Sequence, residues 1–203
     1  MMLMYIYLYN VYGGGCVMAQ YTQRAIIETF EKMLTEMPFD KITVSALVRR
    51  CEISSNTFYY HYRDIYDLLD VWLRGELSVY ADGKPPYDDW RLATKDFLRD
   101  CVEHSTVIYH IFNSISRDRM ERFVFTLGED VFYRYVCQRA AAYEVPEARL
   151  REMADVCRYS FAGLFLRFLW GRMKEDIDSL VNGYGEVLDG LVAGTASKYP
   201  RRL

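Results

Sequence analysis

Residues 42–62 read ITVSALVRRCEISSNTFYYHY, and this stretch decides the fold of the N-terminal part of the chain. Thr43 and Ser54 each precede a short helix-compatible run, and hydroxyl side chains are favoured at the N-cap of a helix. The pattern predicts short helices at about 44–50 and 55–61, separated by a turn of three residues. Two short helices joined so tightly are typical of a helix-turn-helix.

A longer helix is expected just before this pair, at about 22–36. Apolar residues recur along it at the spacing of one helix face, as Ile26, Phe30, Met33, Leu34 and Met37. Pro38 ends the helix, because proline lacks the backbone N–H that would continue it. One longer and two short helices in this order are the arrangement of helix-turn-helix domains that bind DNA.

The outer side of the helix expected at 55–61 suits the major groove of DNA. Its side chains are small or polar: Ser54, Ser55, Asn56, Thr57, Tyr59, Tyr60 and His61. Such groups can meet base edges, and hydroxyls and helix N-termini bind phosphates. Phe58 and Tyr62, four residues apart, are expected on the buried side. Between Lys41 and Arg63 there are four basic residues and one acidic residue, so positive charge is concentrated here.

These residues resemble the TetR family of bacterial transcriptional regulators. The matching positions are Ile42-Thr43-Val44, Leu47-Val48, Ile53-Ser54, Thr57-Phe58-Tyr59, His61-Tyr62 and Asp67-Leu68-Leu69. The runs 58–62, 66–68 and 170–176 further resemble regulators of dihydroxyacetone kinase operons. The resemblance implies an all-α homodimer that binds a near-palindromic operator in double-stranded DNA. It also implies a C-terminal domain that responds to a small-molecule effector or a protein co-regulator.

The motif and the resemblance together predict a set of DNA-binding residues. Asn56, Tyr60 and Ser55 are expected to enter the groove. Tyr59, as the resemblance implies, and His61 are expected at the backbone phosphates. The full set is Thr43, Arg49, Arg50, Ser54, Ser55, Asn56, Thr57, Tyr59, Tyr60, His61 and Arg63.

Each of these assignments has a simpler alternative. Tyr59 can pack on the first helix, and the outer polar residues can face only solvent. Arg49 and Arg50 end a helix, where cations are favoured by the helix dipole in any case.

The chain departs from the family pattern at two positions. Glu52 stands where the family turn usually has glycine, which costs on the order of 1 kcal/mol if that residue has a positive φ. Ile65 stands where the family often has a lysine that meets a phosphate, and Arg63 is the nearby residue that can replace this contact.

The rest of the chain also has helical periodicity and no convincing strand. We expect helices at about 64–80, 88–103, 105–115, 118–143, 147–173 and 176–194. The run Gly83-Lys84-Pro85-Pro86 marks the best boundary, between a DNA-binding domain at 18–80 and a dimerisation and regulatory domain at 81–203. Residues 1–17 are expected to be a non-native or disordered extension. Met18 reads as an ordinary start that leads directly into a helix.

Two further sites are expected in the C-terminal domain. The dimer interface is assigned to Phe161, Phe165, Phe168, Gly183, Val187, Gly190 and Gly194, because glycines along a helix permit close approach of a second copy. The alternative is a frayed C-terminal helix. An effector pocket is assigned to Tyr109, Phe112, Phe123 and Phe132, for which ordinary core packing is the alternative.

Composition excludes several other classes of protein. The net charge of −3 excludes a polycation that coats nucleic acid or membrane, and 51% hydrophobic residues exclude a disordered chain. The five cysteines are odd in number and widely spaced, which favours a reducing cytoplasm and no zinc site. No catalytic or nucleotide-binding motif occurs, so we expect no enzyme, no cofactor and no metal. No segment is expected to cross a membrane.

One rival function from another class stays open. A helical protein-interaction module with this fold need not bind DNA specifically. Residues 19–80 contain seven basic and nine acidic residues, which favours this reading.

Overall fold

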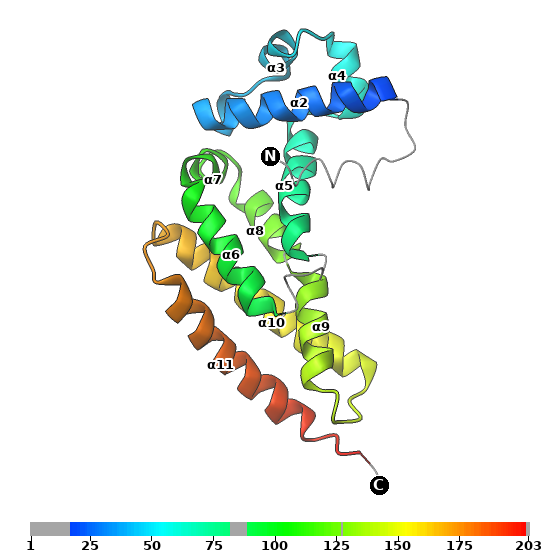
Figure 1. The fold of residues 1–203 in the computed structure, drawn as a ribbon, viewed down its shortest axis with the longest axis vertical. Helices are drawn as coiled ribbons and strands as arrows, with labels where there is room; N and C mark the ends of the chain where they lie inside the picture. Colours follow the sequence, from blue (N-terminus) through cyan, green and yellow to red (C-terminus); the bar gives the residue numbers. More distant parts are fainter. Residues whose placement is uncertain (1–16, 82–88, 127, 202–203) are drawn as a thin grey trace. The chain divides into compact units, whose positions relative to one another are not determined.

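The computed structural model describes residues 17–81, 89–126 and 128–201, and every regular element in these ranges is a helix (Figure 1). The elements in chain order are α2 (Val17–Glu36), the 3₁₀ turn η1 (Phe39–Lys41), α3 (Val44–Arg50), α4 (Ser55–His61), α5 (Ile65–Ala81), α6 (Trp90–Glu103), α7 (Ser105–Phe112), α8 (Arg117–Thr126), α9 (Glu129–Arg139), α10 (Glu147–Trp170) and α11 (Ile177–Ala196). The expected all-α fold is confirmed. The expectations for residues 1–16 and 83–86 lie outside the described residues.

The chain forms two compact units. The first contains residues up to Val79 together with His104–Ser116, and the second contains Tyr80–Glu103 and the residues from Arg117 onward. The boundary that the sequence predicts, at 80/81, lies next to the first of these divisions. Residues 104–116, however, were expected in the C-terminal domain. They belong to the first unit because α7, which they contain, packs on α2.

The contact between α7 and α2 is both polar and apolar. Val107 and Ile111 are buried in the same core as α2. The Nδ1 atom of His110 donates a hydrogen bond to the carbonyl oxygen of Leu34, at 2.7 Å. The N-terminal unit is therefore built from segments that are distant in the sequence.

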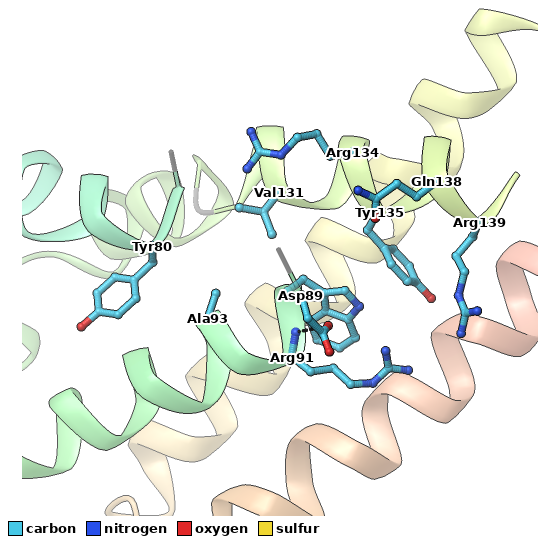
Figure 2. Close-up of a pocket in the computed structure, with 10 residues that line it drawn as sticks. Tyr80, Asp89, Arg91, Ala93, Val131, Arg134, Tyr135, Gln138 and Arg139 are labelled. Carbon is cyan, nitrogen blue, oxygen red and sulfur yellow. Dashed lines mark hydrogen bonds between the residues drawn. The ribbon is translucent and has the colours of Figure 1, made fainter. Parts of the chain in front are cut away.

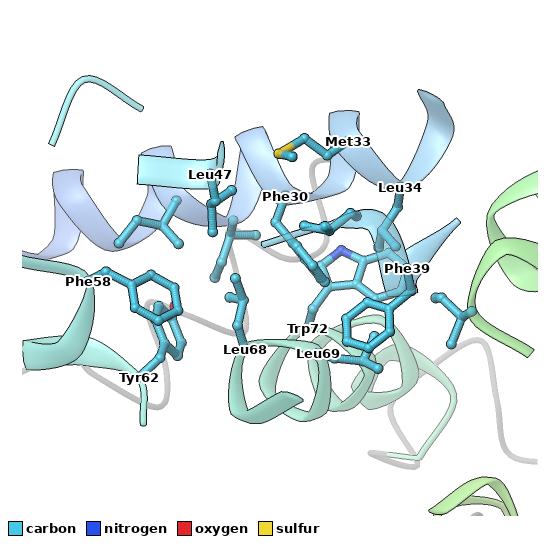
Figure 3. Packing of buried hydrophobic residues seen from close by; sticks show 14 of the residues in the cluster. Phe30, Met33, Leu34, Phe39, Leu47, Phe58, Tyr62, Leu68, Leu69 and Trp72 are labelled. Atoms are coloured by element: carbon cyan, nitrogen blue, oxygen red, sulfur yellow. The ribbon is translucent and has the colours of Figure 1, made fainter. Parts of the chain in front are cut away.

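The core of the N-terminal unit is aromatic and aliphatic (Figure 3). Of the expected stripe, Ile26, Phe30, Met33 and Leu34 are buried there, and Met37, just after the end of α2, is partly buried. Phe30 meets Trp72 of α5 edge to face, with ring centroids 6.3 Å apart. Phe58 and Tyr62 are buried as expected. Each such side chain contributes about 1.5–3 kcal/mol when it leaves water. The short helix α4 is therefore held in place by its inner face.

Local hydrogen bonds explain why α3 and α4 begin at the expected residues. The Oγ1 atom of Thr43 accepts the N–H of Ala46 at 3.2 Å, and the Oγ atom of Ser54 accepts the N–H of Thr57 at 3.1 Å. Both bonds satisfy backbone donors that the helix itself leaves unpaired.

The turn after α3 has the hydrogen bonds of a Schellman motif. The N–H of Ile53 reaches the carbonyl of Val48 at 3.0 Å, and the N–H of Glu52 reaches that of Arg49 at 3.4 Å. Glu52 takes the left-handed conformation, with φ of 55°. The glycine position of the family turn therefore keeps its conformation here, although a side chain occupies it.

The second unit pairs α6 with α11 and α9 with α10 (Figure 1). One expectation was wrong, since residues 118–143 do not form a single helix. The structure has α8 and α9 instead, divided at Gly128, whose φ is +74°. A left-handed glycine interrupts the helical hydrogen bonds, and periodicity alone does not reveal it. Within the described residues, no helix is long and apolar enough to span a bilayer.

The left-handed conformation of Glu52 generates a stability prediction. Glu52→Gly should raise the free energy of unfolding by less than about 1 kcal/mol, because relief of the strain exceeds the extra freedom of glycine in the unfolded chain. Urea denaturation measures the change. Glu52→Ala is the control, since it removes the charge but keeps the Cβ atom, and it should bring no gain. A destabilised Glu52→Gly variant would contradict the prediction.

Candidate nucleic-acid interface

Helix α4 presents one polar face to solvent. Tyr60 is 81% exposed and Tyr59 is 56% exposed, and Ser55 and Asn56 are exposed as well. Phe58, on the opposite side, is fully buried and points into the core (Figure 3). Packing therefore sets the rotation of this two-turn helix about its axis.

Three of the predicted contact residues have a structural role of their own. The hydroxyl groups of Thr43 and Ser54 cap α3 and α4. The hydroxyl of Thr57 is hydrogen-bonded to that of Ser54 at 2.8 Å. These side chains fix the starts of the two helices.

The basic residues of the motif differ in how they are paired. Arg50 binds Glu36 of α2 at 2.5 Å, and Arg63 binds Asp67 at 3.0 Å. Arg49 is exposed and has no ion pair with any residue that the structure describes. A phosphate must compete with carboxylates for Arg50 and Arg63, whereas Arg49 is available directly.

The pairing of Arg63 is reinforced at the backbone. The N–H and the guanidinium of Arg63 both bind the carboxylate of Asp67, at 3.0 Å. These hydrogen bonds hold the pKa of Asp67 below its ordinary value. The i, i+4 spacing could have revealed this pair in the sequence. The Arg50–Glu36 pair spans fourteen residues and has no such signal.

His61 lies at the end of α4 and is half-buried. Burial lowers the pKa of its imidazole below the ordinary value. The ring is therefore mainly neutral at pH 7, so it can offer a phosphate a hydrogen bond but little positive charge.

The residues assigned to a dimer interface fall into two groups. Phe161, Phe165 and Phe168 are buried inside the second unit, so they do not lie on its surface. Gly183, Gly190 and Gly194 lie on an exposed face of α11, where a Cβ atom would meet nothing within 4 Å. Val187 shares this face and is 68% exposed. The nearly continuous apolar run of α10 could not show which of its sides faces inward.

The residues assigned to an effector pocket are divided between the two units. Tyr109 and Phe112 belong to α7 in the first unit, and Phe123 and Phe132 belong to α8 and α9 in the second. Phe132 is core, packed against the ring of Trp90 at a centroid distance of 5.6 Å. A cavity of about 450 Å³ does occur in the second unit, but none of these four residues lines it. The described residues contain no cluster of metal-ligating side chains.

Together, the capped helix pair and the helical second unit define a DNA-binding transcriptional regulator. Residues 26–71 match the family model described as "Bacterial regulatory proteins, tetR family". Residues 88–190, half of the chain, match "Transcriptional regulator C-terminal region". The chain belongs to the TetR family of transcriptional regulators, as the sequence predicted, and both matching models describe regulators and not enzymes.

A solved structure of similar fold is "Dihydroxyacetone kinase operon activator DhaS". The TM-score is 0.60 at 16% sequence identity, and the match covers 89% of this chain and 98% of the other. This likeness supports the fold. A search of curated proteins found no match.

The different pairing of the arginines predicts different salt effects. Arg49→Ala should weaken binding to all DNA sequences and reduce the slope of log K against log salt by about 1, because one phosphate contact is lost. Arg63→Ala should change the slope less, since Asp67 already neutralises its charge. Fluorescence anisotropy with labelled duplex at several salt concentrations gives the slopes.

The control for these variants is Arg117→Ala, an exposed arginine of the second unit that pairs with Glu121. It should leave the slope unchanged. Equal slope changes for the control and for Arg49→Ala would assign the effect to net charge alone.

Proposed function

We propose that the chain binds a near-palindromic operator as a homodimer, with α4 of each protomer in the major groove. The observation that carries the proposal is that α4 has an exposed polar face, while its opposite face is fully buried. Two-fold symmetry of a dimer would place two such helices about one DNA turn, or a multiple of it, apart.

Within this proposal, the residues of α4 have two kinds of contact. Asn56 and Tyr60, four residues apart on the outer side, read base edges together with Ser55. Tyr59 and His61 contact phosphates, and the hydroxyls of the capped helix N-termini contribute further phosphate contacts. Arg49, which has no ion pair with any described residue, supplies positive charge.

The exposed face of α11 is the proposed dimer surface. It combines Gly183, Val187, Gly190 and Gly194, and their open surroundings support close approach of a second helix. On α10, three large hydrophobic residues are also exposed: Val156, Tyr159 and Trp170, at 49%, 51% and 62%. These side chains, and not the three buried phenylalanines, are the ones that α10 can offer to a second copy.

For the signal that the regulator senses, we propose only the kind of partner. A small molecule or a protein co-regulator acts on the second unit, and the protein works in the cytoplasm, where DNA is accessible. The sequence runs at 58–62, 66–68 and 170–176 support a narrower proposal, that the chain belongs with regulators of dihydroxyacetone kinase operons.

The rival function is a protein-interaction module that has lost specific DNA binding. The pairing of Arg50 and Arg63 with carboxylates favours it, because it lowers the positive charge of the motif. Gel shifts at two salt concentrations separate the two functions, since phosphate contacts make affinity fall steeply with salt. Absence of any DNA binding at low salt would support the rival function.

Base contacts and phosphate contacts can be separated by two variants of α4. Asn56→Ala should lower operator affinity by about 1–3 kcal/mol and spare non-specific binding, because it removes a base contact. Tyr59→Phe should weaken binding to all sequences alike with little change in salt slope, because it removes an uncharged phosphate contact. Titration of selected operator and random duplex measures both. An Asn56→Ala variant that binds both duplexes like the parent would show that α4 is used differently.

The dimer surface can be tested where the protomer has empty space. Gly190→Leu adds a side chain at a position where a Cβ atom would meet nothing within 4 Å, so the protomer should keep its fold. The same side chain should block a second copy, so sedimentation should shift toward monomer and operator affinity should fall. Gly163→Leu, where a Cβ atom would likewise meet nothing within 4 Å, probes the exposed side of α10 in the same way. A Gly190→Leu variant that stays dimeric would place the interface elsewhere.

A further inference from the structure

The cavity of the second unit is lined by donors of hydrogen bonds. Its volume is about 450 Å³, which is within the usual range for small-molecule sites. The charged groups of its wall are Arg91, Arg134 and Arg139 against a single acid, Asp89. Tyr135 and Gln138 add polar groups, and Trp90, Val131 and Ala93 add apolar surface (Figure 2). The wall therefore suits an acidic compound with an apolar part.

Three of these lining residues converge on one carboxylate of α11, that of Asp189. Arg91 of α6 binds its Oδ2 atom at 2.6 Å, and Arg139 of α9 binds Oδ1 through Nε at 2.9 Å and Oδ2 through Nη2 at 2.5 Å. The hydroxyl of Tyr135 donates to Oδ1 at 2.6 Å. Figure 2 shows the three side chains reaching toward the neighbouring helix. This is the donor set that proteins use to recognise a carboxylate or phosphate.

The electrostatics agree with a tightly held anion. Burial alone would raise the pKa of Asp189, but hydrogen bonds from Arg139, Tyr135 and Arg91 lower it to about 2. The carboxylate is thus fully ionised at neutral pH. Asp189 therefore binds Arg91 and Arg139 as the acid group of a bound ligand would.

Two details of the surroundings fit this arrangement. Gly185 lies one turn before Asp189, and a Cβ atom there would collide with the guanidinium of Arg91, so the absent side chain gives the arginine its path to Asp189. The indole N–H of Trp90, in the cavity wall, is buried without a hydrogen-bond partner in the part of the chain that the structure describes. A buried donor without an acceptor is costly, and an acidic ligand would bring acceptors to this wall.

We propose that this cavity binds a small organic anion, a carboxylate or a phosphate monoester, and that Asp189 is an internal competitor for the arginines that hold its acid group. When the anion binds, its acid group takes Arg139 and Arg91, and Asp189 loses these partners. Because α11 also carries the proposed dimer surface, binding would then act on the dimer. This last step alone rests on the function proposed above.

The test uses the full chain, calorimetric titration and two probes, benzoate and phenyl phosphate, with neutral benzamide as the probe control. Asp189→Asn should bind the anions at least tenfold more tightly than the parent, because the competitor has lost its charge. The matched control is Asp178→Asn. Asp178 is also on α11 and pairs with Lys95 and Arg99 of α6, but these groups do not line the cavity. It should leave the affinity unchanged.

A second variant keeps the proposal falsifiable if Asp189→Asn does not fold. Arg139 is half exposed, so Arg139→Gln should fold and should bind the anions at least tenfold less tightly. The tighter of the two probes identifies the acid group. Equal affinity of the parent and Arg139→Gln, weaker binding by Asp189→Asn, or equal binding of benzamide would each overturn the proposal. The titration contains no DNA, so its failure is distinct from failure to bind an operator.

Discussion

The burial of Phe58 and Tyr62 is the constraint on which the DNA-binding unit depends. α4 has only seven residues, too few to be stable alone, so its helical conformation relies on packing. The two aromatic side chains supply that packing and also fix the rotation of the helix. With Phe58 inward, Ser55, Asn56, Tyr59 and Tyr60 must face outward. The same contacts that stabilise α4 therefore choose which of its residues can meet DNA.

The DNA-binding unit has less unpaired positive charge around its motif than the sequence suggests. Four basic residues surround the motif, yet Asp40, Glu36 and Asp67 neutralise three of them through ion pairs. Exposed ion pairs contribute little to stability, so they can open when a phosphate offers the same arginine a partner. In the proposed complex with DNA, the motif therefore depends more on hydroxyl, amide and imidazole contacts than on net charge. Such contacts suit selective recognition better than non-specific attraction.

In the second unit, α6 and α11 are joined by a row of ion pairs, which forms a polar seam between the two helices. Arg91, Lys95 and Arg99 repeat at intervals of four along α6 and meet Asp189 and Asp178 of α11. One end of the seam adjoins the cavity, where Arg139 and Tyr135 of α9 join the same carboxylate. A regulatory domain needs an element whose position two sites can influence. Under the two proposals made above, α11 is such an element, because its inner face meets the cavity wall and its outer face is open.

The sequence by itself determined the helix class and the bounds of α3 and α4, and the family resemblance pointed to Glu52 as a residue of left-handed conformation. These features depend on caps, turns and periodicity, whose partners lie within a few residues of one another. It did not reveal the break at Gly128, the return of α7 to the first unit, or which faces of α10 and α11 are buried. It also missed the cluster around Asp189, whose members come from three helices separated by up to 98 residues. Only tertiary packing brings such residues together, because local pattern carries no information about which distant helix a side chain will meet.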